Sequence, residues 1–203
     1  NDPEAKTEWL EAPPHPQKPE MGTRSVPLGR EIWIERNECM EDPPRKFVRM
    51  RPGGEVRLRN AFIVKCTDLI KDSEGNITEI HCEYDPDSRS GLPGASRKVK
   101  GTIHWVSVEH GVNAEVRLYD RLFSVANPLA HKEKYFLEIL NPHSKDIVSD
   151  AVVDPAVAAG KHGEFFKFER VGYFTIDQDS KDPNRPVLNR TVSLRDSWAK
   201  MNK

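Results

Sequence analysis

The sequence predicts an all-β protein built from two antiparallel β-barrels, with a few short helices. About nine to eleven short runs rich in β-branched and aromatic residues follow one another, separated by turn clusters, as is typical of antiparallel sheets. A chain of 203 residues is long enough for two small β domains. Closed or half-closed barrels are the usual way to protect the strand edges of such a chain.

Little regular structure is expected before Glu31. Residues 1–30 are rich in Pro, Glu and Lys, and the prolines remove backbone hydrogen-bond donors. The chain opens in a polar stretch without an initiator Met, which suggests a piece of a longer protein.

The first half of the chain is expected to hold two strands and a hairpin. Glu31–Glu35 is the first strand, and Glu55–Lys65 is the second, because its apolar and basic residues alternate with a period of two. Ile77–Tyr84 alternates in the same way, and the preceding Asp72–Asn76 offers residues that tolerate positive φ. We therefore expect Leu69 and its neighbours to pair with the strand that starts at Ile77.

The second half is expected to hold two longer strands, two short helices and three further strands. The longer strands are Val99–Val108 and Ala114–Phe123, and a hairpin at residues 110–113 is expected to join them. Apolar spacing favours helices at Lys134–Leu140 and Pro155–Lys161. The three further strands are Glu164–Glu169, Gly172–Asp177 and Val187–Leu194.

Composition indicates a soluble protein of a reducing cytoplasm. No apolar run approaches the roughly 18–20 residues of a membrane span, and the amino terminus has no signal-peptide pattern. The three cysteines lack C-x-x-C spacing, so neither a disulfide framework nor a zinc site is indicated. The 31 basic and 32 acidic residues leave a net charge of only -1.

Basic residues nevertheless gather in one segment. Six cations fall between residues 45 and 59, and a hairpin at Pro52–Gly54 could bring most of them to one side. Such a patch could follow phosphates and read bases, because Arg and Lys supply counterion release and forked donors. Phe47 and Tyr119 could add stacking surfaces for unpaired bases. The alternative is a solvated sheet face, balanced by the preceding acidic residues. The six cations are Arg45, Lys46, Arg49, Arg51, Arg57 and Arg59.

No motif points to catalysis by the chain alone. Glycine-rich phosphate loops, the G-x-S-x-G elbow and the H-E-x-x-H zinc motif are all missing from the sequence. The histidines are scattered, with His104 and His110 too far apart to imply a metal pair. Cys39, Cys66 and Cys82 are better explained as small buried hydrophobic residues than as nucleophiles.

Seven stretches of the chain form specific motifs, and they follow one another from about residue 15 to the end. They are the sequences at Lys18–Gly22, Glu31–Ile34, Glu55–Asn60, Lys98–Val106, Arg117–Phe123, Phe168–Phe174 and Asn189–Trp198. These motifs resemble one family, the class I glutaminyl-tRNA synthetases. The resemblance covers only the carboxyl-terminal, anticodon-binding part of those enzymes.

The resemblance implies two barrels of the type found in ribosomal protein L25. Residues 1–37 with 112–203 would form the proximal barrel, whose first strand lies upstream of Asn1, and residues 38–111 the distal barrel. The nucleotide-binding signatures of the catalytic domain are missing from the chain, so it should be inactive alone and carry no cofactor or metal. The parent enzyme would be an ATP-dependent glutamine–tRNA ligase that uses Mg.

The resemblance also implies an RNA site and its partners. The partners would be the anticodon arm of glutamine tRNA and the missing catalytic domain, in a cytoplasmic monomer without a membrane. Val48 and Lys167 depart from the bacterial pattern, which often has Lys and Gln at those positions. The implied RNA-binding residues are Gln17, Arg45, Lys46, Arg49, Arg57, Arg59, Lys167, Arg170 and Arg195.

Three other interpretations stay open at this point. The chain could be a non-catalytic β-barrel scaffold that binds protein, or the same region of a eukaryotic or archaeal-type glutamyl-tRNA synthetase. The closing motif at Arg190–Trp198 favours the glutaminyl branch. An enzyme acting alone is the third interpretation and has no supporting motif.

Overall fold

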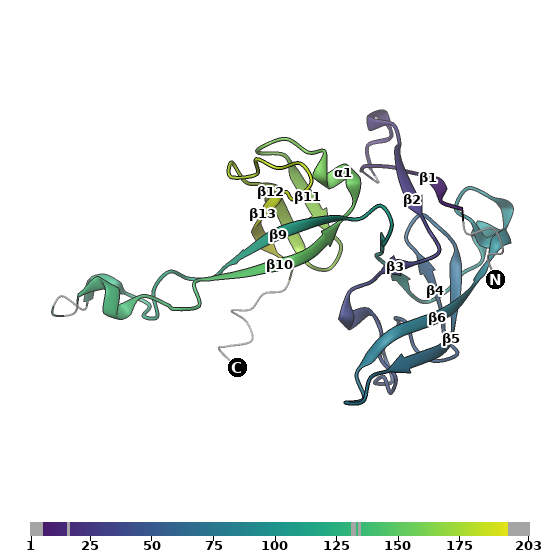
Figure 1. Ribbon diagram of the computed structural model, residues 1–203, viewed down its shortest axis with the longest axis horizontal. Coiled ribbons are helices and arrows are strands. Elements are labelled where there is room, and N and C mark those ends of the chain that lie inside the picture. Colours follow the sequence, from purple (N-terminus) through teal and green to yellow (C-terminus); the bar gives the residue numbers. More distant parts are fainter. Residues whose placement is uncertain (1–5, 16, 131–132, 134, 195–203) are drawn as a thin grey trace. The chain divides into compact units, whose positions relative to one another are not determined.

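The computed structural model describes residues 6–15, 17–130, 133 and 135–194. It divides into two compact units, unit 1 (residues 1–110) and unit 2 (residues 111–203). Strands dominate both units, which confirms the predicted all-β class with a few short helices (Figure 1). No helix of the described residues is long and apolar enough to cross a membrane.

Unit 1 contains three sheets. Two of them are strand pairs, β1 with β2 and β3 with β8, and the third has the order β6-β5-β4-β7. Its strands are β1 (Glu8–Ala12), β2 (Arg24–Leu28), β3 (Ile32–Trp33), β4 (Glu55–Leu58), β5 (Ile63–Lys71), β6 (Ile77–Asp85), β7 (Thr102–Ile103) and β8 (Val106–Ser107). Its 3-10 helices are η1 (Pro19–Met21), η2 (Arg36–Glu38), η3 (Pro86–Ser88) and η4 (Pro93–Ser96).

Unit 2 is built on one five-stranded sheet with the order β10-β9-β13-β12-β11. The segment between β9 and β10 extends away from this sheet as a long arm (Figure 1). The strands are β9 (Val112–Tyr119), β10 (Lys145–Val153), β11 (Phe165–Phe168), β12 (Gly172–Ile176) and β13 (Val187–Ser193). The helices are η5 (Pro128–Ala130), η6 (Phe136–Ile139) and α1 (Pro155–Ala158).

The sheets are mixed rather than purely antiparallel. β4 pairs with β7 in parallel, and β13 pairs with β9 in parallel, whereas the other strand pairs are antiparallel. Each sheet of the described residues has two edge strands, so none of these sheets closes on itself. Each parallel pair joins strands far apart in the sequence, which a local pattern of alternation does not reveal.

The expectation of little structure before Glu31 is wrong. β1 and β2 form an antiparallel pair in which Leu10, Ala12 and Val26 are buried. Pro27 sits opposite Trp9 in this two-stranded ribbon, where both strands are edges and a missing donor is tolerated. Burial of alternate apolar side chains outweighs the loss of backbone donors.

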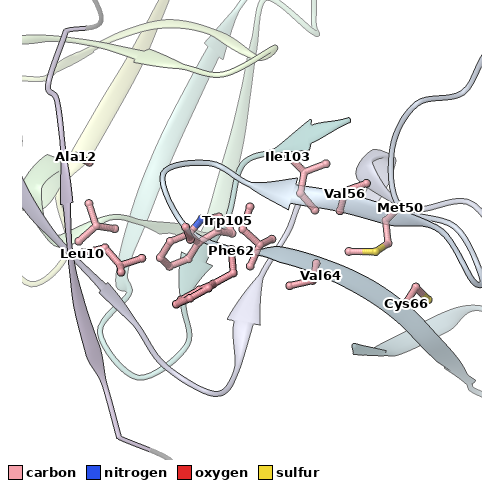
Figure 2. Packing of buried hydrophobic residues seen from close by; sticks show 12 residues of the cluster. Leu10, Ala12, Met50, Val56, Phe62, Val64, Cys66, Ile103 and Trp105 are labelled. Carbon is pink, nitrogen blue, oxygen red and sulfur yellow. The ribbon is translucent and has the colours of Figure 1, made fainter. Parts of the chain in front are cut away.

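Residues 1–37 belong to unit 1 here, whereas the resemblance assigned them to the same barrel as residues 112–203. The physical reason is the core of unit 1, in which Leu10 and Ala12 cluster with Val56, Phe62 and Trp105 (Figure 2). The indole N–H of Trp105 donates to the carbonyl oxygen of Arg59 over 3.0 Å, so this large ring is buried without an unpaired donor.

The predicted strand Glu55–Lys65 is in fact a hairpin of β4 and β5. Asn60 adopts the left-handed conformation with φ 61°, and the N–H of Leu58 donates to the carbonyl of Phe62 over 2.8 Å. Asn is one of the few residues that reach this region at low cost. The predicted pairing of Leu69 with the strand that starts at Ile77 is confirmed.

The hairpin predicted at residues 110–113 is wrong, because β8 pairs with β3 while β9 pairs with β10 and β13. β10 is a further strand that the sequence pattern did not predict. The two predicted helices shrink to the single turns η6 and α1. The three last predicted strands are confirmed as β11, β12 and β13.

Candidate nucleic-acid interface

A basic hollow of about 190 Å³ lies in unit 1, where two segments distant in the sequence meet. One wall is the stretch that leads into β4, and the other is the stretch before β7. Four of its nine lining residues are cations. The lining residues are Phe47, Val48, Arg49, Arg51, Gly54, Glu55, Lys98, Val99 and Lys100.

The two walls touch at Gly101. A methyl group on Gly101 would lie 1.9 Å from the carbonyl oxygen of Val48, so only glycine permits this approach. The carbonyl of Gly101 also accepts a hydrogen bond of 2.8 Å from the N–H of Arg57, which fixes the wall to β4. These backbone contacts therefore hold the two walls together and attach them to β4.

Electrostatics at the hollow favour an anion. The one acidic lining residue, Glu55, is already bound to Arg97, with 2.8 Å between its Oε2 and the Nη1 of Arg97. The guanidinium of Arg97 also contacts Asp85 over 3.0 Å. Lys98 and Lys100 are exposed, and no ion pair is found for either among the described residues. The hollow thus presents cations whose charge is not cancelled locally.

Arg49 has a mixed environment. Its Nε lies 3.6 Å from Oε2 of the buried Glu38, and its Nη1 donates to the carbonyl of Asn37 over 2.8 Å. Its guanidinium carbon lies 5.9 Å from the ring centroid of Phe47. Arg49 is thus partly committed to η2, while Phe47 beside it supplies an aromatic surface in the hollow.

Arg57 does not line the hollow. Its guanidinium donates to the carbonyls of Ser88 (2.8 Å), Ala95 (3.0 Å), Arg97 (3.2 Å) and Ala61 (3.4 Å). These bonds tie β4 to the loop 86–97. Since that loop leads directly into Lys98 and Lys100, Arg57 helps to place the second wall of the hollow.

The predicted hairpin that would gather the cations is not formed, because β4 pairs with β5 and β7 and not with the segment that holds Arg45, Lys46 and Arg49. Arg45, Lys46 and Arg59 are exposed, and none of them lines the hollow. The hollow therefore contains one of the predicted unit 1 residues, Arg49.

Arg51, Lys98 and Lys100 line the hollow although they were not among the predicted site residues. Arg51 belongs to the basic segment 45–59, and the two lysines stand inside the motif Lys98–Val106, which carries part of the family resemblance. What the sequence could not show is that Gly101 lets these distant segments meet.

Gln17 and the predicted residues of unit 2 lie in three different settings. Gln17 is exposed in unit 1, next to η1. Lys167 is exposed on β11, directly opposite Tyr173 of β12. Arg170 is half-buried in the turn between β11 and β12, with a φ of 59°. Arg195 lies outside the described residues.

A second hollow, of about 260 Å³, suits an anion less well. It is lined by Gly29, Arg30, Glu31, Val108 and Glu109, so two carboxylates face one cation. Among the described residues, no group of three or more His, Cys, Asp or Glu side chains could hold a metal ion.

Two family models match the chain, at residues 1–85 and 102–177, and both describe tRNA synthetases class I (E and Q), anti-codon binding domain. The chain therefore belongs to this family of anticodon-binding domains. The resemblance found in the sequence is confirmed.

Within this family the chain is similar to glutamine–tRNA ligases. It is 50% identical to that of Cupriavidus metallidurans over 98% of this chain and 34% of the relative. It is 52% identical to the ligase of Ralstonia pickettii, over 93% of this chain and 33% of that relative. It is 48% identical to the ligase of Pseudomonas putida, over 98% of this chain and 35% of that relative. The chain spans about one third of the length of these curated relatives. Their names favour the glutaminyl over the glutamyl branch.

Proposed function

We propose that this chain binds the unstacked anticodon bases of glutamine tRNA for a parent enzyme that attaches glutamine to that tRNA. The observation that carries the proposal is the basic hollow of unit 1, found in a chain of the anticodon-binding family. Unpaired RNA is recognised by splayed bases that stack on aromatic or guanidinium planes while basic groups hold the phosphates. The hollow offers both, because Phe47 lies among four cations.

The size of the hollow fits a polymer better than a small molecule. Sites that enclose a whole small ligand usually measure about 300–1,000 Å³, and this one measures about 190 Å³. One nucleotide of a longer strand needs only partial enclosure, since its neighbours are held elsewhere. We assign Lys98 and Lys100 to phosphates, where a flexible point charge suffices, and Arg51 to a forked contact.

The remaining predicted residues keep their proposed roles as RNA contacts. Arg45 and Lys46 are exposed and come directly before Phe47, a lining residue of the hollow, in the sequence. Arg59 is exposed and follows β4. Gln17, Lys167, Arg170 and Arg195 are proposed to contact the same RNA. Arg57 is proposed to act there too, although its guanidinium would first have to leave the loop carbonyls that it binds.

The whole protein's chemistry follows from the relatives and is proposed on that basis. The catalytic domain would use ATP and Mg to activate glutamine, while the anticodon-binding chain itself would need no cofactor. We expect a cytoplasmic protein in which this chain works beside its own catalytic domain, as a monomer.

A salt titration tests the RNA site. We expect the affinity of the 203-residue chain for an anticodon stem-loop of glutamine tRNA to fall log-linearly with salt, with a slope of about -3 to -4 if four to six phosphates are neutralised. Lys98→Ala should weaken binding and flatten the slope by about 0.7. Lys65→Ala removes an exposed lysine on β5 outside the hollow and should leave the slope unchanged.

Two results would contradict this proposal. A flat salt response of the unmodified chain would exclude an electrostatic RNA site. No binding at any salt concentration would favour a scaffold that binds protein.

A further inference from the structure

Glu55 is the one carboxylate among the nine residues that line the basic hollow of unit 1. β4 begins at this residue, and its side chain is 40% exposed. A carboxylate that could turn freely at this position would repel an approaching phosphate and compete with it for the same cations. What restrains Glu55 therefore matters for every anion that the hollow could bind.

Arg97 binds both oxygens of this carboxylate. Its Nη1 donates to Oε2 of Glu55 over 2.8 Å, and its Nη2 donates to Oε1 over 3.4 Å. A guanidinium that meets a carboxylate as a fork fixes the rotation of the carboxylate as well as offsetting its charge. Arg97 is not among the lining residues, so this ion pair joins the acid of the hollow to a cation outside the lining.

Arg97 is itself held by three elements of unit 1. Its N–H donates to the carbonyl of Gly94 in η4 over 3.1 Å, and its own carbonyl accepts from Nη2 of Arg57 over 3.2 Å. Its Nη2 also donates to Oδ2 of Asp85 over 3.0 Å, while Oδ1 of Asp85 accepts from the N–H of Asp87. The guanidinium of Arg97 thus keeps a partner even if the carboxylate of Glu55 is removed.

We infer that Arg97 is a positioning residue of the RNA site, which restrains the carboxylate of Glu55 so that Lys98 and Lys100 stay available to phosphates. The inference rests on the proposed function and adds to it a residue that acts without touching the RNA. The pair is about 40% exposed on both sides, and ion pairs of this kind contribute little to stability. Its effect is therefore expected in RNA affinity and not in folding.

A double-variant cycle tests the inference with the 203-residue chain and an anticodon stem-loop of glutamine tRNA. Arg97→Ala should weaken binding, because the released carboxylate of Glu55 competes with phosphate for a lysine. Glu55→Gln should change the affinity less than about twofold in the unmodified chain, yet restore it by about fivefold or more in the Arg97→Ala chain. If Arg97 were only one more cation, Glu55→Gln would strengthen binding by the same factor in both chains.

The salt dependence separates a positioning role from direct contact with RNA. Arg97→Ala should flatten the slope by about 0.7, because one lysine is now occupied by the carboxylate of Glu55. The double variant Arg97→Ala/Glu55→Gln should recover the slope of the unmodified chain. If Arg97 itself bound a phosphate, the slope would stay flat in the double variant.

The pair of Arg89 and Glu8 is the matched control. Nη1 of Arg89 lies 2.8 Å from Oε1 of Glu8, with side chains 38% and 39% exposed, and neither residue lines the hollow. The cycle of Arg89→Ala and Glu8→Gln makes the same changes of charge. Its two effects on RNA affinity should add, without coupling. Urea unfolding verifies that each variant is folded under the binding conditions.

Equal effects of Glu55→Gln in both chains, or a slope that the double variant does not recover, would overturn the role of Arg97 while RNA binding itself persists. Coupling of the same size in the control pair would overturn it too. Failure of the unmodified chain to bind the stem-loop would instead refute the proposed function.

Discussion

The guanidinium of Arg57 links β4 to the loop 86–97 through hydrogen bonds, and it also carries a positive charge. It donates to three carbonyls of the loop 86–97 and to that of Ala61, at distances from 2.8 to 3.4 Å. Buried carbonyls that lose a charged donor are costly, because they give up both the bond and their earlier contact with water. Arg57 therefore contributes to stability whether or not it also touches RNA.

Arg57→Ala should lower the free energy of unfolding by about 1.5–3 kcal/mol, the range for hydrogen bonds to a charged group. Urea unfolding measures this change. Arg45→Ala is the control, because Arg45 is exposed and surface changes of this kind stay within about 0.5 kcal/mol. If the two variants have the same free energy of unfolding, the hydrogen bonds of Arg57 to the loop 86–97 do not stabilise the fold.

The three cysteine thiols are poor nucleophiles in the folded chain. Burial, and to a lesser degree the neighbouring Cys66, raises the pKa of Cys39 to about 11. Burial also raises the pKa of Cys82 to about 12. Since only the thiolate reacts, a raised pKa lowers reactivity at every pH below it.

At pH 8 we expect iodoacetamide to alkylate Cys39 about 100-fold more slowly than an ordinary cysteine, because its thiolate fraction is smaller by that factor. Mass spectrometry of each cysteine peptide follows the reaction. The same chain in urea provides the control and should react at the ordinary rate. Equal rates in the folded and unfolded chain would show that burial does not suppress ionisation.

The hollow depends on how closely the segment before β7 approaches the segment before β4. Gly101 permits this approach, with its Cα facing the carbonyl oxygen of Val48. A backbone oxygen cannot rotate away as a flexible side chain can. Any side chain at residue 101 must therefore separate the two walls.

Gly101→Ala should destabilise the chain by about 1–3 kcal/mol through overpacking and should weaken RNA binding as the walls part. Melting temperature and stem-loop affinity measure the two effects. Gly29→Ala is the matched control, since a methyl group there would meet its nearest neighbour, the hydroxyl of Ser107, at an ordinary 3.4 Å. Equal stability of the two variants would mean that the walls are not held in contact.

Local sequence patterns predicted antiparallel hairpins better than they predicted pairs of strands that lie far apart in the sequence. The hairpin around Asp72 was predictable, because the turn chemistry lies within the pattern itself and the carboxylate of Asp72 accepts from the N–H groups of Glu74 and Asn76. The pair of β1 and β2 was not, since prolines hid its alternation. The parallel pairs of β4 with β7 and β13 with β9 join distant segments that no local period connects.

At the scale of the whole molecule, a nearly neutral chain still presents separate basic surfaces. The net charge is -1, yet the hollow of unit 1 collects four cations around one acidic residue that is already paired. The cationic segment 45–59 was predictable from the sequence alone. Its partner wall at Lys98 and Lys100 was not, because only the folded chain brings these residues beside Arg51.

The exposed face of the unit 2 sheet was also hidden in the sequence. The alternation of β11 and β12 indicates two faces but does not say which one is buried, since both carry aromatic residues. Packing against the core of unit 2 settles this and leaves Phe165 and Tyr173 outside. Lys167 could be named from the family resemblance, whereas its aromatic neighbours required the strand register.

The most direct test of the anticodon role compares two stem-loops that differ in one base. Equilibrium competition at fixed salt would set the anticodon stem-loop of glutamine tRNA against the same RNA with its central anticodon base replaced. We predict that the unmodified chain prefers the cognate loop by about 5- to 150-fold, as a mismatch of about 1–3 kcal/mol requires. Equal affinity for the two loops would contradict anticodon reading by this chain.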